Sequence, residues 1–384
     1  MSSVQAQEVP CIIVGAGPAG LATAACLKEA GVEPLVLERS DTVGSSWRRH
    51  YTRLHLHTVK KHSGLPFRGF DAHVPRYPSR DEVVAYFEDY AAHFEIRPRH
   101  GVTVESLERG KRGWAVHTDG GTFRSPHVVM ATGYNRVPNR PDWPGQEEFP
   151  GTVLHSSEFK SGSDFTGQRV LVVGCGNSGA EIALDLHEAG ATTALVVRSP
   201  LWVTPRDVWG LFPSQISSIR LSALPVSVAD FLAKGLLRLL VGDLSRYGID
   251  RPEEGPNHMI WTRGRVPMLD IGTLKSIKAG EIAVHRGVER FEGPRVHFTD
   301  AASEEFDAVV LATGYRSGLS ALLPDGDERL NARGLPTRFG ADGGEDGLFF
   351  IGFRNPPTGA LREIAIEAQG IAACVAGSPA LLSL

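Results

Sequence analysis

The chain has 384 residues, which is enough for two or three domains of roughly 150 residues each. Hydrophobic residues make up 42% of it and charged residues 22%, a balance that is typical of a globular protein. The net charge of −4 and the absence of a basic run argue against nucleic acid as a partner.

The cysteines and the hydrophobic segments exclude further classes. The four cysteines, Cys11, Cys26, Cys175 and Cys374, form neither a Cys-x-x-Cys pair nor a spacing that suits zinc. We therefore expect no metal site and reduced thiols, as in a cytoplasmic protein. The most hydrophobic window, 231–242, contains two charged residues and is too short to span a bilayer, so no stable membrane insertion is expected.

The first predicted unit is residues 12–39, IIVGAGPAGLATAACLKEAGVEPLVLER. It reads as a strand, a Gly-x-Gly-x-x-Gly turn, a helix and a second strand, the pattern of a dinucleotide site. The phosphates are expected at the positive end of the helix. An acid at the end of the second strand accepts hydrogen bonds from ribose hydroxyls and repels a 2′-phosphate, which favours FAD or NAD. The residues expected at this nucleotide are Gly15, Gly17, Pro18, Ala19, Gly20, Glu38 and Arg39.

Residues 102–134 predict a short strand, a meander of alternating strands and a buried strand that ends in Ala-Thr-Gly-Tyr. Residues 282–315 repeat this pattern and its ending. Each meander therefore follows one dinucleotide unit. Thr132 and Thr313, in the two Ala-Thr-Gly-Tyr turns, are expected to contribute to cofactor binding.

The second predicted unit is residues 171–199, LVVGCGNSGAEIALDLHEAGATTALVVRS. It repeats the first unit, but Arg198 stands where the first has Glu38. A cation at this place, followed by Ser199, suits the 2′-phosphate of NADP. The two units therefore predict two different nucleotides, FAD or NAD at the first and NADP at the second. The residues expected at the second nucleotide are Gly174, Gly176, Asn177, Ser178, Gly179, Arg198 and Ser199.

The rest of the chain predicts how the two units are combined. The amphipathic stretch 227–244 is expected to cap the second domain and a substrate channel. Residues 347–375 predict a strand, a loop and a helix that starts near residues 358–359, with its N-terminus toward the flavin ring. We expect an α/β fold of two Rossmann-like domains, similar to glutathione reductase. The FAD-binding domain is predicted at 1–163 and 315–384, with the NADP-binding domain, 164–314, inserted in it.

FAD and NADPH together indicate hydride transfer, but they leave the final electron acceptor open. A disulfide reductase needs a redox cysteine pair, which this sequence lacks. A monooxygenase that uses O2 and a reductase that feeds a protein partner both remain, with a nucleotide sensor as a more remote third possibility.

The segment FPGTVLHSSEF, residues 149–159, carries a family resemblance. It fits Phe-x-Gly-x-x-x-His-x-x-x-Phe, which identifies class B flavin monooxygenases, and ends in Phe159 where the Baeyer–Villiger branch has Trp. His155 is expected to shape the interdomain linker. Long stretches, among them LERSDTVGSSWRRHYTRLHLHTVKKHSGLPF and RGRVPMLDIGTLKSIKAGEIAV, resemble the plant YUCCA-type enzymes.

This resemblance implies oxidative decarboxylation of indole-3-pyruvate to indole-3-acetate through a C4a-peroxyflavin, with NADPH and O2 as co-substrates. The stretches 207–225 and 352–368 match the plant pattern less well, and both are expected near the substrate. N- or S-oxygenation of a small amine or sulfide, through the protonated hydroperoxide, therefore stays open as the alternative. Nothing in the sequence predicts the oligomeric state.

The resemblance also suggests roles for single residues. His57 stands where animal-type members have an Asn near the flavin, so it either bonds the peroxide or NADP+ or is an ordinary partly buried histidine. Trp47 is expected beside the flavin. His55 and His57 have no third ligand and predict no metal. The candidates for binding a substrate carboxylate are Arg206, Arg251, Arg263 and Arg265.

Overall fold

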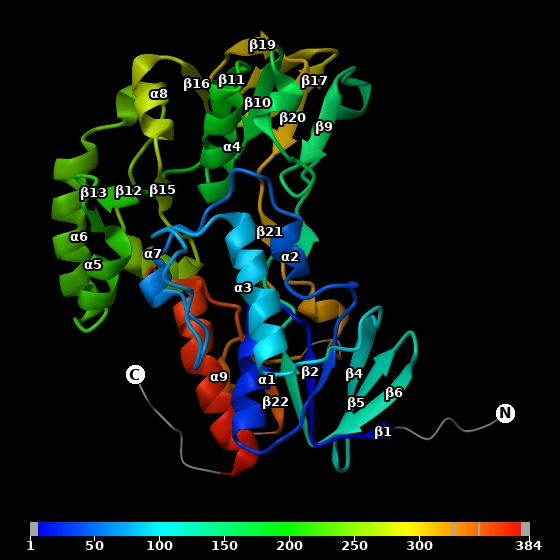
Figure 1. Ribbon diagram of the computed structural model, residues 1–384. Helices are drawn as coiled ribbons and strands as arrows, with labels where there is room; N and C mark the ends of the chain where they lie inside the picture. The colour runs from blue at the N-terminus through cyan, green and yellow to red at the C-terminus, as the bar shows by residue number, and fades with distance from the viewer. Residues whose placement is uncertain (1–6, 325–326, 345, 378–384) are drawn as a thin grey trace.

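The computed structural model describes residues 7–324, 327–344 and 346–377. Its lower sheet in Figure 1 is parallel, with the order β22-β7-β2-β3. Helices α1, α3 and α9 pack on one face, while a meander and β1 cover the other. Strands buried on both faces read as continuous apolar runs, as Cys11–Val14 does. The elements are β1 (Gln7–Glu8), β2 (Cys11–Val14), α1 (Pro18–Glu29), β3 (Leu35–Leu37), α2 (Ser45–Arg48), α3 (Arg80–His93), β4 (Val104–Gly110), β5 (Gly113–Thr118), β6 (Gly121–Ser125), β7 (His127–Met130), β22 (Leu348–Phe350) and α9 (Ala360–Ala376).

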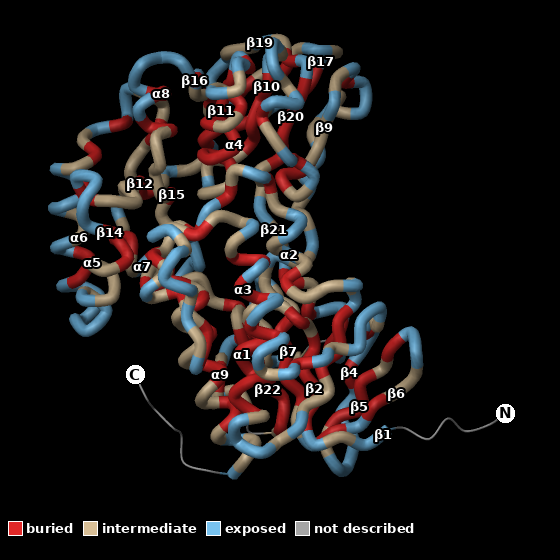
Figure 2. The backbone as a smooth tube through the Cα atoms, in the orientation of Figure 1, coloured by how far each residue is buried: buried red, intermediate tan, exposed pale blue. Residues whose placement is uncertain are grey.

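The upper sheet in Figure 1 repeats this plan, with five parallel strands in the order β16-β11-β10-β20-β9. Helices α4 and α8 lie on one face and a three-stranded meander on the other. Figure 2 shows the buried backbone concentrated in two separate cores, one for each sheet. The elements are β9 (Thr152–His155), β10 (Arg169–Val173), α4 (Asn177–Glu188), β11 (Thr192–Val196), α8 (Thr273–Ala279), β16 (Ile282–His285), β17 (Val288–Glu292), β18 (Arg295–Phe298), β19 (Ser303–Glu305) and β20 (Ala308–Leu311).

A mostly helical insertion, residues 201–267, separates β11 from β15 and lies beside the two sheets at the left of Figure 1. The predicted amphipathic stretch is helix α6 within it. Many of its apolar side chains are exposed, Phe231 and Leu239 among them. The elements are β12 (Val203–Pro205), β13 (Asp207–Val208), β14 (Phe212–Pro213), α5 (Ser214–Leu221), α6 (Val226–Val241), α7 (Pro256–Arg263) and β15 (Met268–Asp270).

The predicted pair of α/β dinucleotide folds is confirmed, including both meanders and the return of the chain to the first sheet through β22 and α9. The exact division into domains remains a prediction, and its limits at residues 1 and 384 lie outside the described residues. Strand β9 precedes the predicted boundary at 163 but belongs to the second sheet. Two short strands, β8 (Val137–Pro138) and β21 (Tyr315–Arg316), pair where the chain crosses between the sheets.

Across the described ranges, none of the helices combines the length and the apolar character that crossing a membrane requires.

Candidate active site

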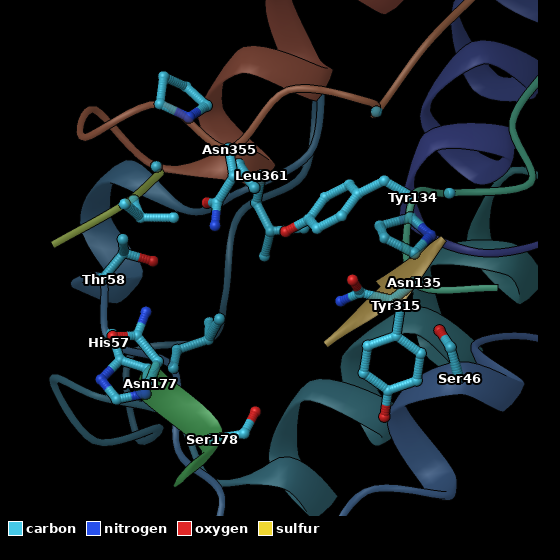
Figure 3. A pocket seen from close by; sticks show the side chains of 18 of the residues that line it. Ser46, His57, Thr58, Tyr134, Asn135, Asn177, Ser178, Tyr315, Asn355 and Leu361 are labelled. Carbon is cyan, nitrogen blue, oxygen red and sulfur yellow. The ribbon is translucent and has the colours of Figure 1, made fainter. Parts of the chain in front are cut away.

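One cavity of about 940 Å³ lies between the two glycine-rich turns and the helical insertion. Residues of both turns line it, together with α5, α6, α7 and the loop before α9. In Figure 3, Asn177 and Ser178 of the second unit face Asn355 and Leu361 across open space, with His57 at the side. Each unit therefore presents its turn to the same cavity.

The first and third glycines of each turn are required by the backbone. Gly15 and Gly174 have φ values of 109° and 108°, where a side chain is strained. A Cβ on Gly20 would lie 1.9 Å from the Gly15 oxygen, and a Cβ on Gly179 would lie 1.9 Å from the Gly174 oxygen. These glycines let each helix approach its strand, as the Rossmann pattern predicts.

The middle glycines leave space for a ligand. A Cβ on Gly17 or Gly176 would meet nothing within 4 Å in the protein, and both residues line the cavity. They are the N-caps of α1 and α4, and neither helix has a side-chain cap. The free N–H groups and open backbone fit a pyrophosphate at each helix N-terminus. The geometry of both turns therefore suits the predicted dinucleotides.

Glu38 lines the cavity at the end of β3 and is buried. Its two carboxylate oxygens accept hydrogen bonds from the backbone N–H of Ala16 at 2.7 Å and of Ser40 at 2.9 Å. These bonds hold the carboxylate beside the glycine turn with lone pairs left for ribose hydroxyls. Arg39 and Pro18 also line the cavity, as does Ala19.

Arg198 and Ser199 follow β11 at the edge of the second unit and are not among the cavity-lining residues. Arg198 is exposed, and its guanidinium has no ion pair within the described ranges. An unpaired guanidinium next to the glycine turn remains available for a phosphate that extends out of the cavity.

The two predicted threonines differ. The Thr132 hydroxyl is buried without a hydrogen-bond partner in the described chain and lines the cavity. The Thr313 hydroxyl instead donates to the backbone oxygen of Asn139 at 2.5 Å, and Thr313 does not line the cavity. The second threonine therefore fastens the interdomain linker.

His57 and Trp47 both line the cavity. Trp47 packs edge-on against Phe87, with ring centroids 6.3 Å apart. The Nε2 atom of His57 lies 3.4 Å from a carboxylate oxygen of Glu181, while its Nδ1 atom is buried without a partner in the described chain. His57 therefore has one ring nitrogen fixed by the protein and one that a cofactor or substrate can engage.

Sequence reasoning missed Glu181 and Tyr51. Glu181 is 2% exposed on helix α4, and it accepts a hydrogen bond of 2.9 Å from the Tyr51 hydroxyl. Burial and then the Glu181 charge raise the pKa of Tyr51, so the hydroxyl stays protonated. In the sequence, Glu181 stands out as a carboxylate among the small and apolar residues that form the buried face of α4.

His50 was also missed, although it lines the cavity. Burial, followed by the charge of Lys160, lowers its pKa to about 4. The imidazole is therefore neutral at pH 7.

Gln215 of α5 is a further residue that the sequence did not single out. It is buried and lines the cavity. Its side chain accepts from the Val59 N–H and donates to the Thr358 oxygen, each at 2.8 Å. It therefore joins the helical insertion to the chain after His57 and to the start of α9.

His155 of the linker motif is fully buried at the end of β9. Its Nδ1 accepts from the Ser157 N–H at 3.1 Å, so the hydrogen is on Nε2, which lies 3.1 Å from the Gly314 oxygen. Burial lowers its pKa and keeps the ring neutral. Both ring nitrogens are occupied by structural contacts, which agrees with a linker-shaping role.

Only one of the four carboxylate-binding candidates lines the cavity, and it is Arg206. Arg251 donates to the Gly242 oxygen and stacks on Trp202, while Arg263 pairs with Glu254. Arg265 is exposed and does not line the cavity.

The four cysteines are free thiols. Burial raises the pKa of Cys11, Cys26 and Cys175 to about 12, so these three stay protonated at neutral pH and are poor nucleophiles. Cys374 is exposed on α9.

The family model described as pyridine nucleotide-disulphide oxidoreductase matches residues 12–213. The structure is similar to the flavin-containing monooxygenase from Stenotrophomonas maltophilia, with a TM-score of 0.70 and 20% identity, over 96% of this chain and 99% of that one. It is equally similar to a bacillithiol disulfide reductase from Bacillus cereus, with a TM-score of 0.70 and 21% identity, over 97% and 99%. These structures share the fold, which serves more than one chemistry.

Similarity in sequence over most of the chain is more specific. The chain is 43% identical over 351 residues to indole-3-pyruvate monooxygenase YUCCA1 of Oryza sativa subsp. japonica, covering 89% of this chain and 86% of the relative. It is 40% identical to indole-3-pyruvate monooxygenase YUCCA6 of Arabidopsis thaliana, covering 89% and 85%. The chain therefore belongs to the YUCCA family of flavin-containing monooxygenases, NADPH-dependent enzymes that use FAD and NADP.

Proposed function

We propose that the chain oxidatively decarboxylates indole-3-pyruvate, or a closely related aromatic 2-oxo acid, using NADPH and O2. The names of its plant relatives support this reaction. The observation that carries the proposal is that both dinucleotide turns and an apolar helical wall line one shared cavity. A small organic substrate in that cavity lies next to both cofactors.

The protein's part is to bind, orient and shield. Bound FAD would supply the redox chemistry that passes electrons from NADPH to O2. Leu236, Leu240 and Ile260 give one side of the cavity an apolar surface. His57 offers its free Nδ1 atom to the reacting group or to NADP+, and this histidine is the proposed catalytic residue.

The proposed cofactor contacts follow the two units. FAD is held by Gly15, Gly17, Pro18, Ala19, Gly20, Glu38, Arg39, Trp47 and Thr132. NADP is held by Gly174, Gly176, Asn177, Ser178, Gly179, Arg198 and Ser199, with Thr313 supporting the site through Asn139. We also propose 1–163 and 315–384 as the FAD-binding domain and 164–314 as the NADP-binding domain.

The remaining proposals concern the setting. The enzyme is proposed to work in the cytoplasm on a small molecule, with O2 as its second substrate. The overall change is balanced: the 2-oxo acid, O2, NADPH and a proton give the acid shortened by one carbon, CO2, NADP+ and water. One atom of O2 enters the acid and the other leaves as water.

The test is product analysis under ¹⁸O₂ with indole-3-pyruvate, phenylpyruvate, trimethylamine and a thioether as substrates. We expect indole-3-acetate with one labelled oxygen atom, CO2 release, and one NADPH consumed for each acid formed. N- or S-oxides with inert keto acids would overturn the proposal. NADPH oxidation that yields only hydrogen peroxide with every substrate would also overturn it.

A further inference from the structure

Among the arginines that line the cavity, Arg206 is the one that the helical insertion carries. The described lining contains the arginines Arg39, Arg49, Arg136 and Arg206. The first three lie on segments of the FAD side: Arg39 after β3, Arg49 directly after α2 and Arg136 after β7. Arg206 instead comes between β12 and β13, where its backbone oxygen accepts from the Ser214 N–H at 3.0 Å, at the start of α5.

The guanidinium of Arg206 is held in place, but part of its hydrogen-bonding capacity is unused. It lies over the Tyr77 ring, with Cζ 4.1 Å from the centroid, and Nε is 3.4 Å from Asp207. The two terminal nitrogens donate no hydrogen bond within the described chain. Stacking on Tyr77 and the ion pair with Asp207 therefore fix the plane of the guanidinium, while its two terminal nitrogens remain available as a bidentate donor.

The charged side chains around Arg206 leave a net positive charge beside the cavity. Asp207 is shared with Arg76 at 3.8 Å and accepts from the Tyr77 hydroxyl at 2.5 Å. Burial and the bond to Asp207 raise the pKa of Tyr77, so the phenol is neutral. Two guanidinium groups thus face one carboxylate, which leaves one positive charge in excess at the cavity.

An apolar wall accompanies this cation. Leu221 of α5, Leu236 and Leu240 of α6 and Ile260 of α7 line the same cavity. All belong to the insertion that begins beside Arg206. A ligand that combines a planar carboxylate with an aromatic or aliphatic ring system matches this pairing of a fixed guanidinium with an apolar surface.

We propose that Arg206 binds the carboxylate of the substrate through its terminal nitrogens, while the ring of the substrate lies against the wall of α5, α6 and α7. The inference rests on the proposed function, which it deepens by assigning the group that selects a 2-oxo acid over a neutral ketone. Arg206 is thus a specificity-determining residue that contacts the substrate.

The test compares Arg206→Gln and Arg206→Lys with Arg220→Gln. Arg220 is an exposed arginine on α5, outside the cavity lining, so its variant makes the same charge change on the same insertion. The probes are two non-reacting ligands of one shape, indole-3-propionate and indole-3-propionamide, titrated calorimetrically into FAD-loaded enzyme. FAD content and the rate of flavin reduction by NADPH report whether each variant is intact.

We expect Arg206→Gln to weaken indole-3-propionate binding, and to raise KM for indole-3-pyruvate, by roughly 10- to 100-fold, the loss typical of a hydrogen-bonded charge pair. Amide binding should change little, Arg206→Lys should fall between, and Arg220→Gln should match the wild type. Equal losses for acid and amide, or none for the acid, overturn the inference. If Arg206→Gln does not fold, the acid-to-amide ratio in Arg206→Lys decides. A wild type that makes no indole-3-acetate overturns the proposed function instead.

Discussion

The carboxylate of Glu181 lies 3.4 Å from Nε2 of His57, and the same oxygen accepts a hydrogen bond from Tyr51. Glu181 stands on α4, beside the second glycine turn, whereas His57 and Tyr51 follow the first unit. The contact therefore joins the two nucleotide-binding halves inside the cavity wall. A hydrogen on Nε2 facing Glu181 leaves Nδ1 as an acceptor, so the carboxylate selects the tautomer of His57.

Glu181→Gln should weaken the contacts with His57 and Tyr51 without changing the shape of the side chain. Tyr51 and His57 lose a charged acceptor, and we expect the free energy of unfolding to fall by about 1–3 kcal/mol. We also expect less acid product for each NADPH consumed, because Nδ1 is no longer held as an acceptor. Chemical denaturation and the product-to-NADPH ratio measure the two effects.

The matched control for that change is Glu188→Gln on the same helix. Glu188 pairs with Arg53 at the surface, with its side chain about half exposed, and such pairs contribute roughly 0–1 kcal/mol. Glu188→Gln should leave the ratio of acid product to NADPH consumed unchanged. An equal ratio in the Glu181 variant and the wild type would show that Glu181 has a structural role alone.

Arg198→Ala tests the coenzyme assignment. The guanidinium is exposed and unpaired within the described chain, so its removal breaks no internal ion pair or hydrogen bond. We expect KM for NADPH to rise roughly 10- to 100-fold through loss of charge-assisted bonds to the 2′-phosphate, with KM for NADH nearly unchanged. Steady-state kinetics with both coenzymes measure this. A wild type that prefers NADH, or equal shifts for both coenzymes, contradicts the assignment.

Gly17→Ala and Gly20→Ala separate cofactor binding from folding. A Cβ at Gly17 meets no protein atom within 4 Å but fills space expected for pyrophosphate, so FAD affinity should fall while the apoprotein keeps its Tm. A Cβ at Gly20 lies 1.9 Å from the Gly15 oxygen, so the apoprotein itself should be destabilised. Thermal melts of apoprotein and FAD titrations distinguish the two. Wild-type FAD affinity in Gly17→Ala would place the cofactor elsewhere.

The stability of the protein should fall in acid partly because of His50. Burial lowers its folded-state pKa to about 4, below the usual 6.5. As the pH drops below 6.5, the unfolded chain gains a proton that the folded chain does not, so stability is lost until about pH 4. The slope from this one group is at most about 1.4 kcal/mol per pH unit.

Urea unfolding at several pH values between 7 and 4 measures that loss. The variant His50→Asn should show a shallower dependence across this window, whatever its stability at pH 7. Parallel curves for variant and wild type would mean that His50 titrates normally in the folded protein.

Several features of this protein were determined by the sequence because they depend on short-range geometry. The φ of Gly15 and the close approach at Gly20 are requirements of one strand, one turn and one helix, so the spacing of three glycines predicts them. The meander before β20 likewise follows from alternating residues within one segment. The repeat then predicts the second sheet from the first.

Tertiary structure alone decided which side chains meet. Four arginines of the same insertion have equal claims in sequence, yet Arg206 is the one that lines the cavity, whereas Arg251 and Arg263 bond to Gly242 and Glu254. Thr132 and Thr313 occupy equivalent repeats, yet one faces the cavity and the other holds Asn139. Glu181 reaches His57 across more than a hundred residues. Such contacts depend on the placement of whole domains, which no local pattern of residues encodes.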